Sequence, residues 1–304
     1  MKIKKMKAII IKTFLLTVLI LNLNACNNKN NYADNVAIVD DKAITKDTYT
    51  KELDFYQKFY TMEHGEQYLE SEAERGKTNN DVLQKSLIDS LIKDQVMVND
   101  LKENNIKLDD NTASSIRANL EKNLGGKDSL KANVAALGVS ESAFNDVLYN
   151  DSIRKQHYDY FLSHNDIKDS DILEYYKKNK KFQRQYKYNL LIFDDENQAN
   201  KAKASIKTKE DFKSYLNKNI KNYDILNSDF VYEDDLILKE SKVLEKDKIS
   251  NVFKHDNKYM ILMVNSYNDN ENDLLLNVKE IYMKEKYEDY LNKLVKKSKI
   301  RVFI

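Results

Sequence analysis

The stretch VAIVDDKAITKDTYTKEL, residues 36–53, decides the fold because its hydrophobic spacing changes halfway along. Its first half places short apolar runs on either side of the acidic pair Asp40-Asp41, which predicts two short strands joined by a turn. After Thr45, an N-cap residue, large apolar side chains recur at helical spacing, at Tyr49, Leu53, Tyr56 and Tyr60. The stretch therefore predicts a strand, a tight turn, a second strand and an amphipathic helix.

Upstream of this stretch, residues 1–26 have the order of an export signal. Five lysines, the last at position 12, precede an uncharged run at 13–21 and then the sequence Leu23-Asn24-Ala25-Cys26. That run is too short for a permanent membrane span. The last four residues resemble a bacterial lipobox, which implies cleavage before Cys26 and a lipid, including palmitate, attached there.

Cys26 is the only cysteine in the chain, so the mature protein would have no thiol left for disulfides, metal binding or catalysis. We expect a lipid anchor on the outer face of the cell membrane, followed by a flexible polar tether at 27–35. The formal net charge is +1, or about −4 without the five signal lysines, which excludes the basic footprint of a nucleic-acid-binding protein.

Apolar spacing predicts a mostly helical region up to residue 185. The strongest pattern lies between 81 and 103, where leucine, isoleucine and valine repeatedly fall on one helix face. Further helices are expected over 110–124, 127–137, 140–162 and 169–179, the third led by Ser140 and the last by Ser170.

The pattern changes at Tyr186. YKYNLLIF at 186–193 and KYMILMV at 258–264 are rich in strand-forming residues, a helix is expected over 196–217, and another strand near 229–232. A polar run at 268–273 precedes a final helix and the short strand IRVFI at 300–304.

The order of these segments resembles the PrsA and SurA type of extracytoplasmic foldase. Residues 36–53 resemble the family's opening, although Asp40-Asp41 replaces its usual Asn-Gly turn. LQKSLIDSLIKDQVMVNDLKENNIKL at 83–108 resembles its next long helix, and IKDSDILEYYKKNKKF at 167–182 the helix before its isomerase domain. YEDYLNKLVKKSKIRVFI at 287–304 resembles the C-terminal helix and strand that complete its first lobe.

The resemblance implies an α+β fold in two parts: a mostly helical SurA-like lobe at 36–185 plus 275–304, and an inserted parvulin-like domain at 186–268. The first and last strands of a parvulin each carry a histidine, where this chain has Asn189 and Met260. Asp224 matches the family's cysteine or aspartate position, and Leu238 aligns loosely with an apolar residue that contacts the proline ring.

Loss of both imidazoles predicts weak or absent prolyl isomerase activity. The enzyme must lower a rotation barrier of about 18–20 kcal/mol in an apolar pocket lined by a polar network. We therefore expect Met260 to pack in a core strand. An active isomerase with a reshaped site, using Asn189, Asp224 and Asp229, is the alternative.

The first predicted helix and its continuation carry more large side chains than one face can bury. Tyrosine and methionine suit a surface that contacts varied apolar segments. The candidate client-binding residues are Phe55, Tyr56, Phe59, Tyr60, Met62 and Tyr68.

No metal or cofactor is expected. No third ligand stands at metal spacing from His157 and His164, so these are expected to be surface or partly buried histidines, and His255 to lie in a turn before the last strand of the insert.

The sequence thus predicts a membrane-anchored chaperone or foldase that binds unfolded or newly exported polypeptides and assists their folding. Self-association as a homodimer is left open. A solute-binding lipoprotein is a further alternative, but residues 45–180 lack the repeated strand and helix alternation of such proteins.

Overall fold

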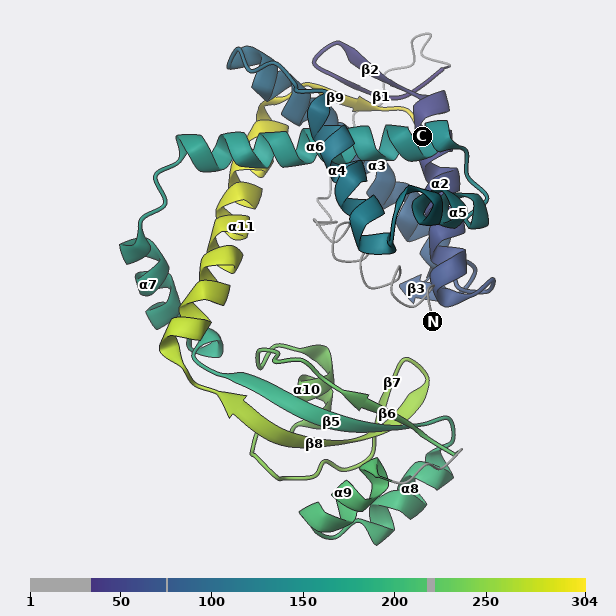
Figure 1. Ribbon diagram of the computed structural model, residues 1–304, viewed down its shortest axis with the longest axis vertical. Helices are drawn as coiled ribbons and strands as arrows, with labels where there is room; N and C mark the ends of the chain where they lie inside the picture. The colour runs from purple at the N-terminus through teal and green to yellow at the C-terminus, as the bar shows by residue number, and fades with distance from the viewer. Residues whose placement is uncertain (1–33, 75, 218–221) are drawn as a thin grey trace. The chain divides into compact units, whose positions relative to one another are not determined.

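A computed structural model describes residues 34–74, 76–217 and 222–304, and the chain divides into two compact units (Figure 1). The first unit comprises Met1–Asp166 and Tyr287–Ile304, and the second comprises Ile167–Lys286. The expected insert, 186–268, lies within the second unit. The signal segment, Cys26 and most of the tether lie outside the described residues. The predicted α+β fold class is confirmed.

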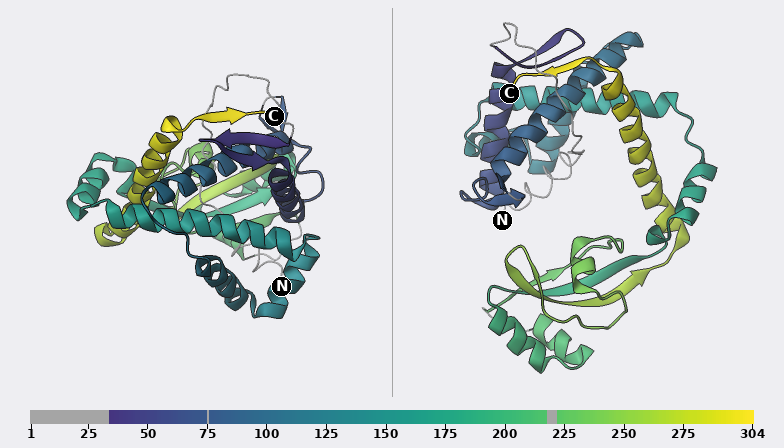
Figure 2. Two further views of the ribbon diagram at one scale, coloured as in Figure 1. Left: turned by 90° about the horizontal axis from the view of Figure 1, so that it is seen from above. Right: turned by 180° about the vertical axis from the view of Figure 1, so that it is seen from behind.

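A three-stranded sheet of order β2-β1-β9 joins distant parts of the chain in the first unit. β1 (Asn35–Val39) pairs antiparallel with β2 (Lys42–Thr45) and with β9 (Ile300–Val302). Figure 2 shows β9, in yellow, beside β1, in purple. Asp40 and Asp41 have φ angles of 46° and 69°, the two positive values of a type I′ hairpin, which aspartate tolerates.

Helices form most of the described part of the first unit. Their bounds follow the predicted ranges to within a few residues: α2 (Lys46–His64), α3 (Asn79–Glu103), α4 (Asn111–Leu124), α5 (Lys127–Ala136), α6 (Glu141–His164) and the end of α11 (Glu271–Lys297). Thr45 and Ser140 cap α2 and α6, because their hydroxyl oxygens accept from the backbone N–H three residues later at 3.2 and 3.1 Å. The small hairpin β3 (Glu72–Glu74) and β4 (Lys77–Thr78) was not predicted.

The second unit is built on an antiparallel sheet of order β6-β5-β8-β7. Its strands are β5 (Gln185–Phe193), β6 (Asp224–Asn227), β7 (Phe253–His255) and β8 (Lys258–Asn268). α8 (Glu196–Ser205) and α9 (Lys209–Leu216) pack on one face through Ala199, Ala202 and Phe212. α10 (Leu236–Ser241) packs on the other face through Leu238. α7 (Asp169–Lys178) packs with the start of α11 in a separate cluster.

Three local predictions were wrong. The helix expected over 196–217 is two helices, because the Thr208 and Asp211 capping box starts α9 anew. No strand lies over 229–232 as expected: β6 spans Asp224–Asn227, and within the expected range only Val231 forms an isolated bridge, with Tyr186. Ser170 does not cap α7, which begins at Asp169 without a side-chain cap.

Candidate functional site

Three stacked rings lie at the end of α2 and in the loop that follows. Tyr60 is one turn before His64, and Tyr68 comes after Gly65, whose φ of 97° redirects the chain. The His64 and Tyr68 ring centroids are 4.2 Å apart, and each lies 6.0 Å from that of Tyr60. The interplanar angles are 17–28°, so the rings form one stacked cluster.

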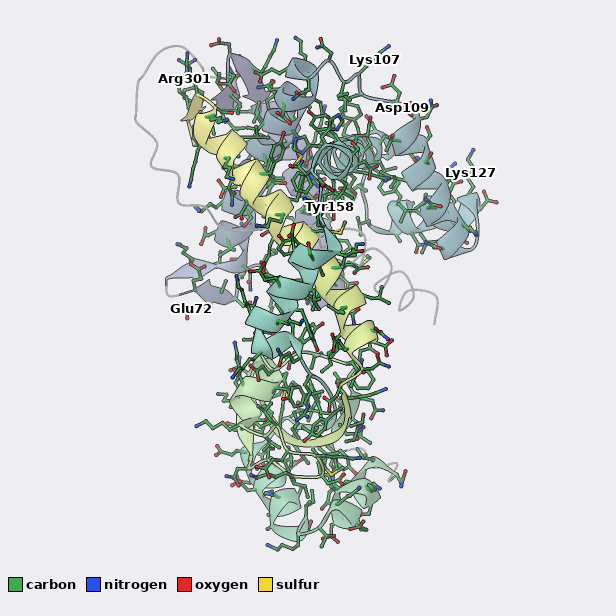
Figure 3. All side chains as sticks on the ribbon, turned by 90° about the vertical axis from the view of Figure 1, so that its left-hand side faces the viewer. Glu72, Lys107, Asp109, Lys127, Tyr158 and Arg301 are labelled. Atoms are coloured by element: carbon green, nitrogen blue, oxygen red, sulfur yellow. The ribbon has the colours of Figure 1, made fainter. Side chains whose placement is uncertain are left out.

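Beside this stack is a pocket of about 200 Å³, which we call the aromatic pocket. It is lined by Tyr60, Tyr68, Leu69, Asn79, Val82, Leu83 and Ser86. The Asn79 amide donates to the carbonyl oxygen of Tyr68 at 3.0 Å, which ties the loop to the start of α3. Figure 3 labels Glu72, on the β3 strand that follows this loop. Ligand sites for drug-sized molecules start at about 300 Å³, so a site of this size suits a single apolar side chain.

The six candidate client-binding residues separate into different environments. Phe55 and Phe59 are 3% and 7% exposed, so both rings belong to the core. Tyr56 packs against the same cluster as Phe55. Tyr60 and Tyr68 line the aromatic pocket, whereas Met62 is half-buried and does not line it. Burial raises the pKa of the Tyr60 hydroxyl, which keeps it protonated.

In the second unit, strand register separates the two positions where the resemblance implies histidines. Asn189 pairs with Met263, whereas Met260 pairs with Ile192. Because side chains alternate along a strand, Asn189 lies on the face of α8 and α9 and Met260 on the face of α10. The two positions therefore do not form one site in this chain.

The α10 face is apolar where the isomerase site was expected. Met260 is 6% exposed and Leu238 1% exposed, and both belong to one hydrophobic cluster. Met260 is thus a core side chain, as expected. Asp224 lies on the edge strand β6, where it pairs with Ile192 of β5, and its side chain is exposed. Asp229, two residues beyond the end of β6, is exposed as well. The polar residues of the reshaped-site alternative are therefore not gathered together.

Asn189 has a structural role on its own face of the sheet. Its amide nitrogen donates to the side-chain oxygen of Asn227, and its oxygen accepts from the Asn265 amide at 2.8 Å. The three asparagines connect β6, β5 and β8 in a row. This row accounts for the hydrogen bonds that a buried asparagine needs.

An ionic network lies in the interior of the first unit, and the sequence analysis did not predict it. Arg154 donates to both oxygens of Asp94 at 2.8 and 2.7 Å and to Asp151 at 3.0 Å. Glu52, 2% exposed, accepts from the Asn150 amide at 2.5 Å. Burial, reinforced by Asp94, raises the pKa of Glu52 to about 8, and burial raises the pKa of Asp151 to about 6. Glu52 is therefore mostly neutral at pH 7.

A second buried network joins α11 to α3 and α6. The His157 ring is fully buried, whereas a surface or partly buried ring was expected, and its Nδ1 lies 2.8 Å from the Tyr287 hydroxyl and its Nε2 3.1 Å from the Asp100 carboxylate. The Tyr290 hydroxyl donates to the same carboxylate at 2.8 Å. Burial lowers the pKa of His157, against the opposing effect of Asp100. Figure 3 labels Tyr158, whose ring packs edge-on against Tyr287 where α6 meets α11.

The remaining histidines have local partners. His164 Nδ1 lies 2.9 Å from the Tyr160 carbonyl oxygen, and His255 ends β7, 2.8 Å from Glu240 and just before the turn at Asp256. Within the described ranges, no group of three or more histidine, cysteine or acidic side chains has a metal-binding arrangement. No helix in that part of the chain has both the length and the apolar character of a membrane span.

Two domain-family models match this chain. A SurA-like N-terminal domain matches residues 1–123, and a PPIC-type PPIase domain matches residues 167–275. The chain belongs to the SurA-like foldases with a PPIC-type domain. The second match begins at the residue where the second compact unit of this foldase begins. A search among curated proteins finds no match.

Solved structures similar to this SurA-like foldase share little sequence with it. One is a structure described with the SurA-like chaperones PEB4 and Cj1289 of Campylobacter jejuni. It is 18% identical in sequence with a TM-score of 0.41, and the match covers 88% of this chain and 98% of the other. The foldase protein PrsA of Lactococcus lactis is 13% identical, with a TM-score of 0.39, over 88% and 94%. PrsA of Streptococcus pneumoniae is 9% identical, with a TM-score of 0.35, over 84% and 88%. The family assignment rests on the two domain models.

Sequence reasoning found the rings of the aromatic pocket but missed its second wall. The first turns of α3 supply this wall, through Val82, Leu83 and Ser86. The missed signal is the capping box of Thr78 and Asp81, which starts α3 directly after the hairpin and so brings its first turns against the Tyr68 loop.

Proposed function

We propose that this SurA-like foldase is a membrane-anchored extracytoplasmic chaperone that binds unfolded exported polypeptides through the aromatic pocket. The observation that carries the proposal is the pocket itself, where two tyrosines and three aliphatic side chains surround a space of about 200 Å³. Such a space accepts one apolar side chain of an unfolded segment. A folded protein has already buried most such side chains, so the pocket favours unfolded clients.

The lining also explains how the pocket would accept varied clients. Tyrosine presents a broad apolar ring with a polar hydroxyl, so it contacts different side chains without requiring one partner shape. Full burial of a leucine or phenylalanine contributes about 1.5–3 kcal/mol, which gives weak and reversible binding at each site. A chaperone needs that reversibility to release its client.

We further propose that the PPIC-type domain has lost its isomerase activity. The α10 face places Met260 and Leu238 in a closed hydrophobic cluster, and Asn189 is held on the opposite face by two other asparagines. A twisted amide would find no charged or hydrogen-bonding network at these positions.

Anchoring through Cys26 is the third part of the proposal, and the order of residues 1–26 supports it. We expect the mature wild-type protein to gain the mass of a diacylglycerol and to fractionate with membranes. Cys26→Ser should lose that mass and leave the membrane fraction. Membrane-bound Cys26→Ser protein without added lipid mass would contradict lipid anchoring.

The client-binding proposal is tested by suppression of aggregation of reduced, denatured lysozyme. Replacing both Tyr68 and Leu83 by alanine removes opposite walls of the pocket, so we expect the concentration needed for half-protection to rise about tenfold. Tyr149→Ala is the matched control, because Tyr149 is 45% exposed on α6 and does not line the pocket. Equal protection by all three proteins would contradict the proposal.

The same preparations are assayed for isomerisation of a short Xaa-Pro peptide. We expect the rate to equal the uncatalysed background. A rate well above background would instead support the reshaped-site isomerase.

A further inference from the structure

The edge strand β6 presents one side of its backbone to solvent. In the order β6-β5-β8-β7 it has a single described neighbour, β5. The Ser228 N–H donates to the Tyr188 carbonyl oxygen at 3.0 Å, and Leu226 pairs with Leu190 two residues further along. Since hydrogen-bonded pairs alternate in an antiparallel ladder, the N–H and C=O groups of Leu226 point to β5.

The same alternation turns the backbone groups of Ile225 and Asn227 away from β5. These two residues therefore offer two donors and two acceptors at the spacing that another strand uses. Beyond Ser228, an extra residue bulges the chain before Val231 pairs with Tyr186 through hydrogen bonds of 2.7 and 2.9 Å. The open edge is thus short, and it is limited to the regular strand.

Exposed apolar side chains lie on this strand and in the chain that follows it. Ile225 and Leu226 are 38% and 42% exposed, and Phe230 and Leu236 are 42% and 64% exposed. Exposed large apolar residues beside unpaired strand groups are the features that recruit another strand. Since Ile225 and Leu226 lie on opposite faces of β6, an added strand could contact apolar side chains on both faces.

The acidic charge around β6 limits which polypeptide segments could pair with its free edge. Residues 224–235 contain five acidic residues and no basic one. Asp234 is paired with Lys181, but Asp224, Asp229 and Glu233 make no ion pair with another described residue. Two copies of this chain pairing through β6 would bring two acidic segments together, which disfavours a dimer through this edge. A segment that combines apolar residues with lysine or arginine is complementary.

We propose that the free edge of β6 is a second client-binding surface, which takes up an extended apolar and basic polypeptide segment as an added strand. This inference rests on the proposed chaperone function, because only an unfolded client offers such a segment. Backbone pairing recognises extended chain irrespective of most of its side chains, whereas the aromatic pocket takes one side chain at a time.

The test uses a fluorescent ten-residue peptide of alternating valine and threonine with a lysine at each end. Ile225→Pro removes an outward N–H and leaves the bonds of Leu226 to β5, and proline is tolerated at such edge positions. Ile225→Thr is the matched control, because it keeps the N–H and the branched side chain. We expect Ile225→Pro to weaken peptide binding about five- to tenfold and Ile225→Thr to change it less than about twofold.

Hydrogen exchange distinguishes strand pairing from unfolding, because the two change the protection of different amides. In the wild type, the peptide should slow exchange at the Ile225 and Asn227 amides, while the Leu226 amide is already protected by β5. The same peptide N-methylated at alternate residues keeps its side chains but cannot pair, so it should bind about tenfold more weakly. Asp224→Asn with Asp229→Asn should weaken binding and reduce its dependence on salt.

The outcomes distinguish a failure of the β6-edge proposal from a failure of the proposed chaperone function. Ile225→Pro binding as tightly as wild type, or the N-methylated peptide binding equally well, would overturn the edge proposal and leave the aromatic pocket untouched. Protection of Ile225 and Asn227 that grows with protein concentration without peptide would identify a second copy as the occupant and also overturn it. Absence of peptide binding together with absence of lysozyme protection would overturn the chaperone function itself.

Discussion

Charged side chains lie deep in the first unit, whereas the α10 face of the second unit is apolar at the positions where an isomerase needs polar groups. In the first unit, Arg154 pairs with the buried Asp94 and the half-buried Asp151, and His157 is fully buried. In the second unit, Met260 occupies the strand position that the resemblance assigns to a histidine. The buried polar groups of the first unit hold helices together, whereas the sheet of the second unit has an apolar side chain at this position. The loss of isomerase activity proposed above would therefore leave the fold of the sheet intact.

The largest effect is expected on the stability of the first unit, when the cation of its buried ionic network is removed. Arg154→Met leaves the carboxylates of Asp94 and Asp151 without their cation, so we expect a loss of about 3–5 kcal/mol in the free energy of unfolding of that unit. Urea denaturation followed by circular dichroism measures it, and hydrogen exchange shows which unit opens. Amides of the second unit should keep their protection.

Arg117→Met is the control for Arg154. Arg117 also pairs with two acids, Glu121 at 3.2 Å and Glu141 at 3.0 Å, but at a more exposed site. Its loss should cost less than about 1 kcal/mol. Similar losses for the two variants would show that the buried network is no more important than a surface one.

An intermediate effect is expected when a histidine is restored in the second unit. Met260→His buries a polar ring in the α10 cluster, so stability of that unit should fall by about 1–3 kcal/mol, whereas Met260→Leu should cost less than about 1.5 kcal/mol. Because Asn189 lies on the other face, Met260→His should not raise peptide isomerisation. A clear gain of activity would show that the α10 face can still support catalysis.

The smallest expected effect is a pH dependence of the stability of the first unit, caused by Glu52. Burial raises the pKa of Glu52 from 4.5 to about 8, so the folded state holds this proton more tightly than the unfolded state. Its contribution to stability is complete below about pH 4.5 and is lost as pH rises towards 8. Glu52→Gln should therefore gain at least about 1 kcal/mol relative to wild type between pH 5 and pH 9.

Unfolding midpoints of Glu52→Gln and wild type across this pH range measure the effect. Glu66→Gln, on the exposed loop after α2, controls for removal of one carboxylate. A constant difference between Glu52→Gln and wild type across the range would mean that Glu52 is ionised in the folded state throughout, so that burial does not raise its pKa.

Local sequence patterns predicted the helices and strands. The facing of strand residues and the buried ion pairs depend on contacts between distant residues, which local patterns do not reveal. Helix ranges followed from apolar spacing and caps such as Thr45, which depend on neighbouring residues. Strand order alone did not reveal that Asn189 and Met260 face opposite ways, because the face of each residue depends on register. The Arg154 and Asp94 pair joins residues 60 positions apart, and no local pattern announces such a contact.

The division between Phe59 and Tyr60 has the same origin. Both residues are large and aromatic, and the sequence analysis assigned both to client binding. One residue is a rotation of about 100° around a helix, so Phe59 turns into the core while Tyr60 turns to the pocket.

The β2-β1-β9 sheet constrains the order in which the molecule can assemble. The Lys299 N–H donates to the Asp40 carboxylate at 2.7 Å across 259 positions, so closing this sheet spans a loop that contains the whole second unit. Ile167–Lys286 is continuous and forms its contacts without that closure. We therefore expect a nascent copy to fold its second unit early and to pair β9 with β1 late, with one edge of β1 unpaired in the meantime. Until that closure, the chaperone itself presents the kind of unpaired strand that it is proposed to bind in others.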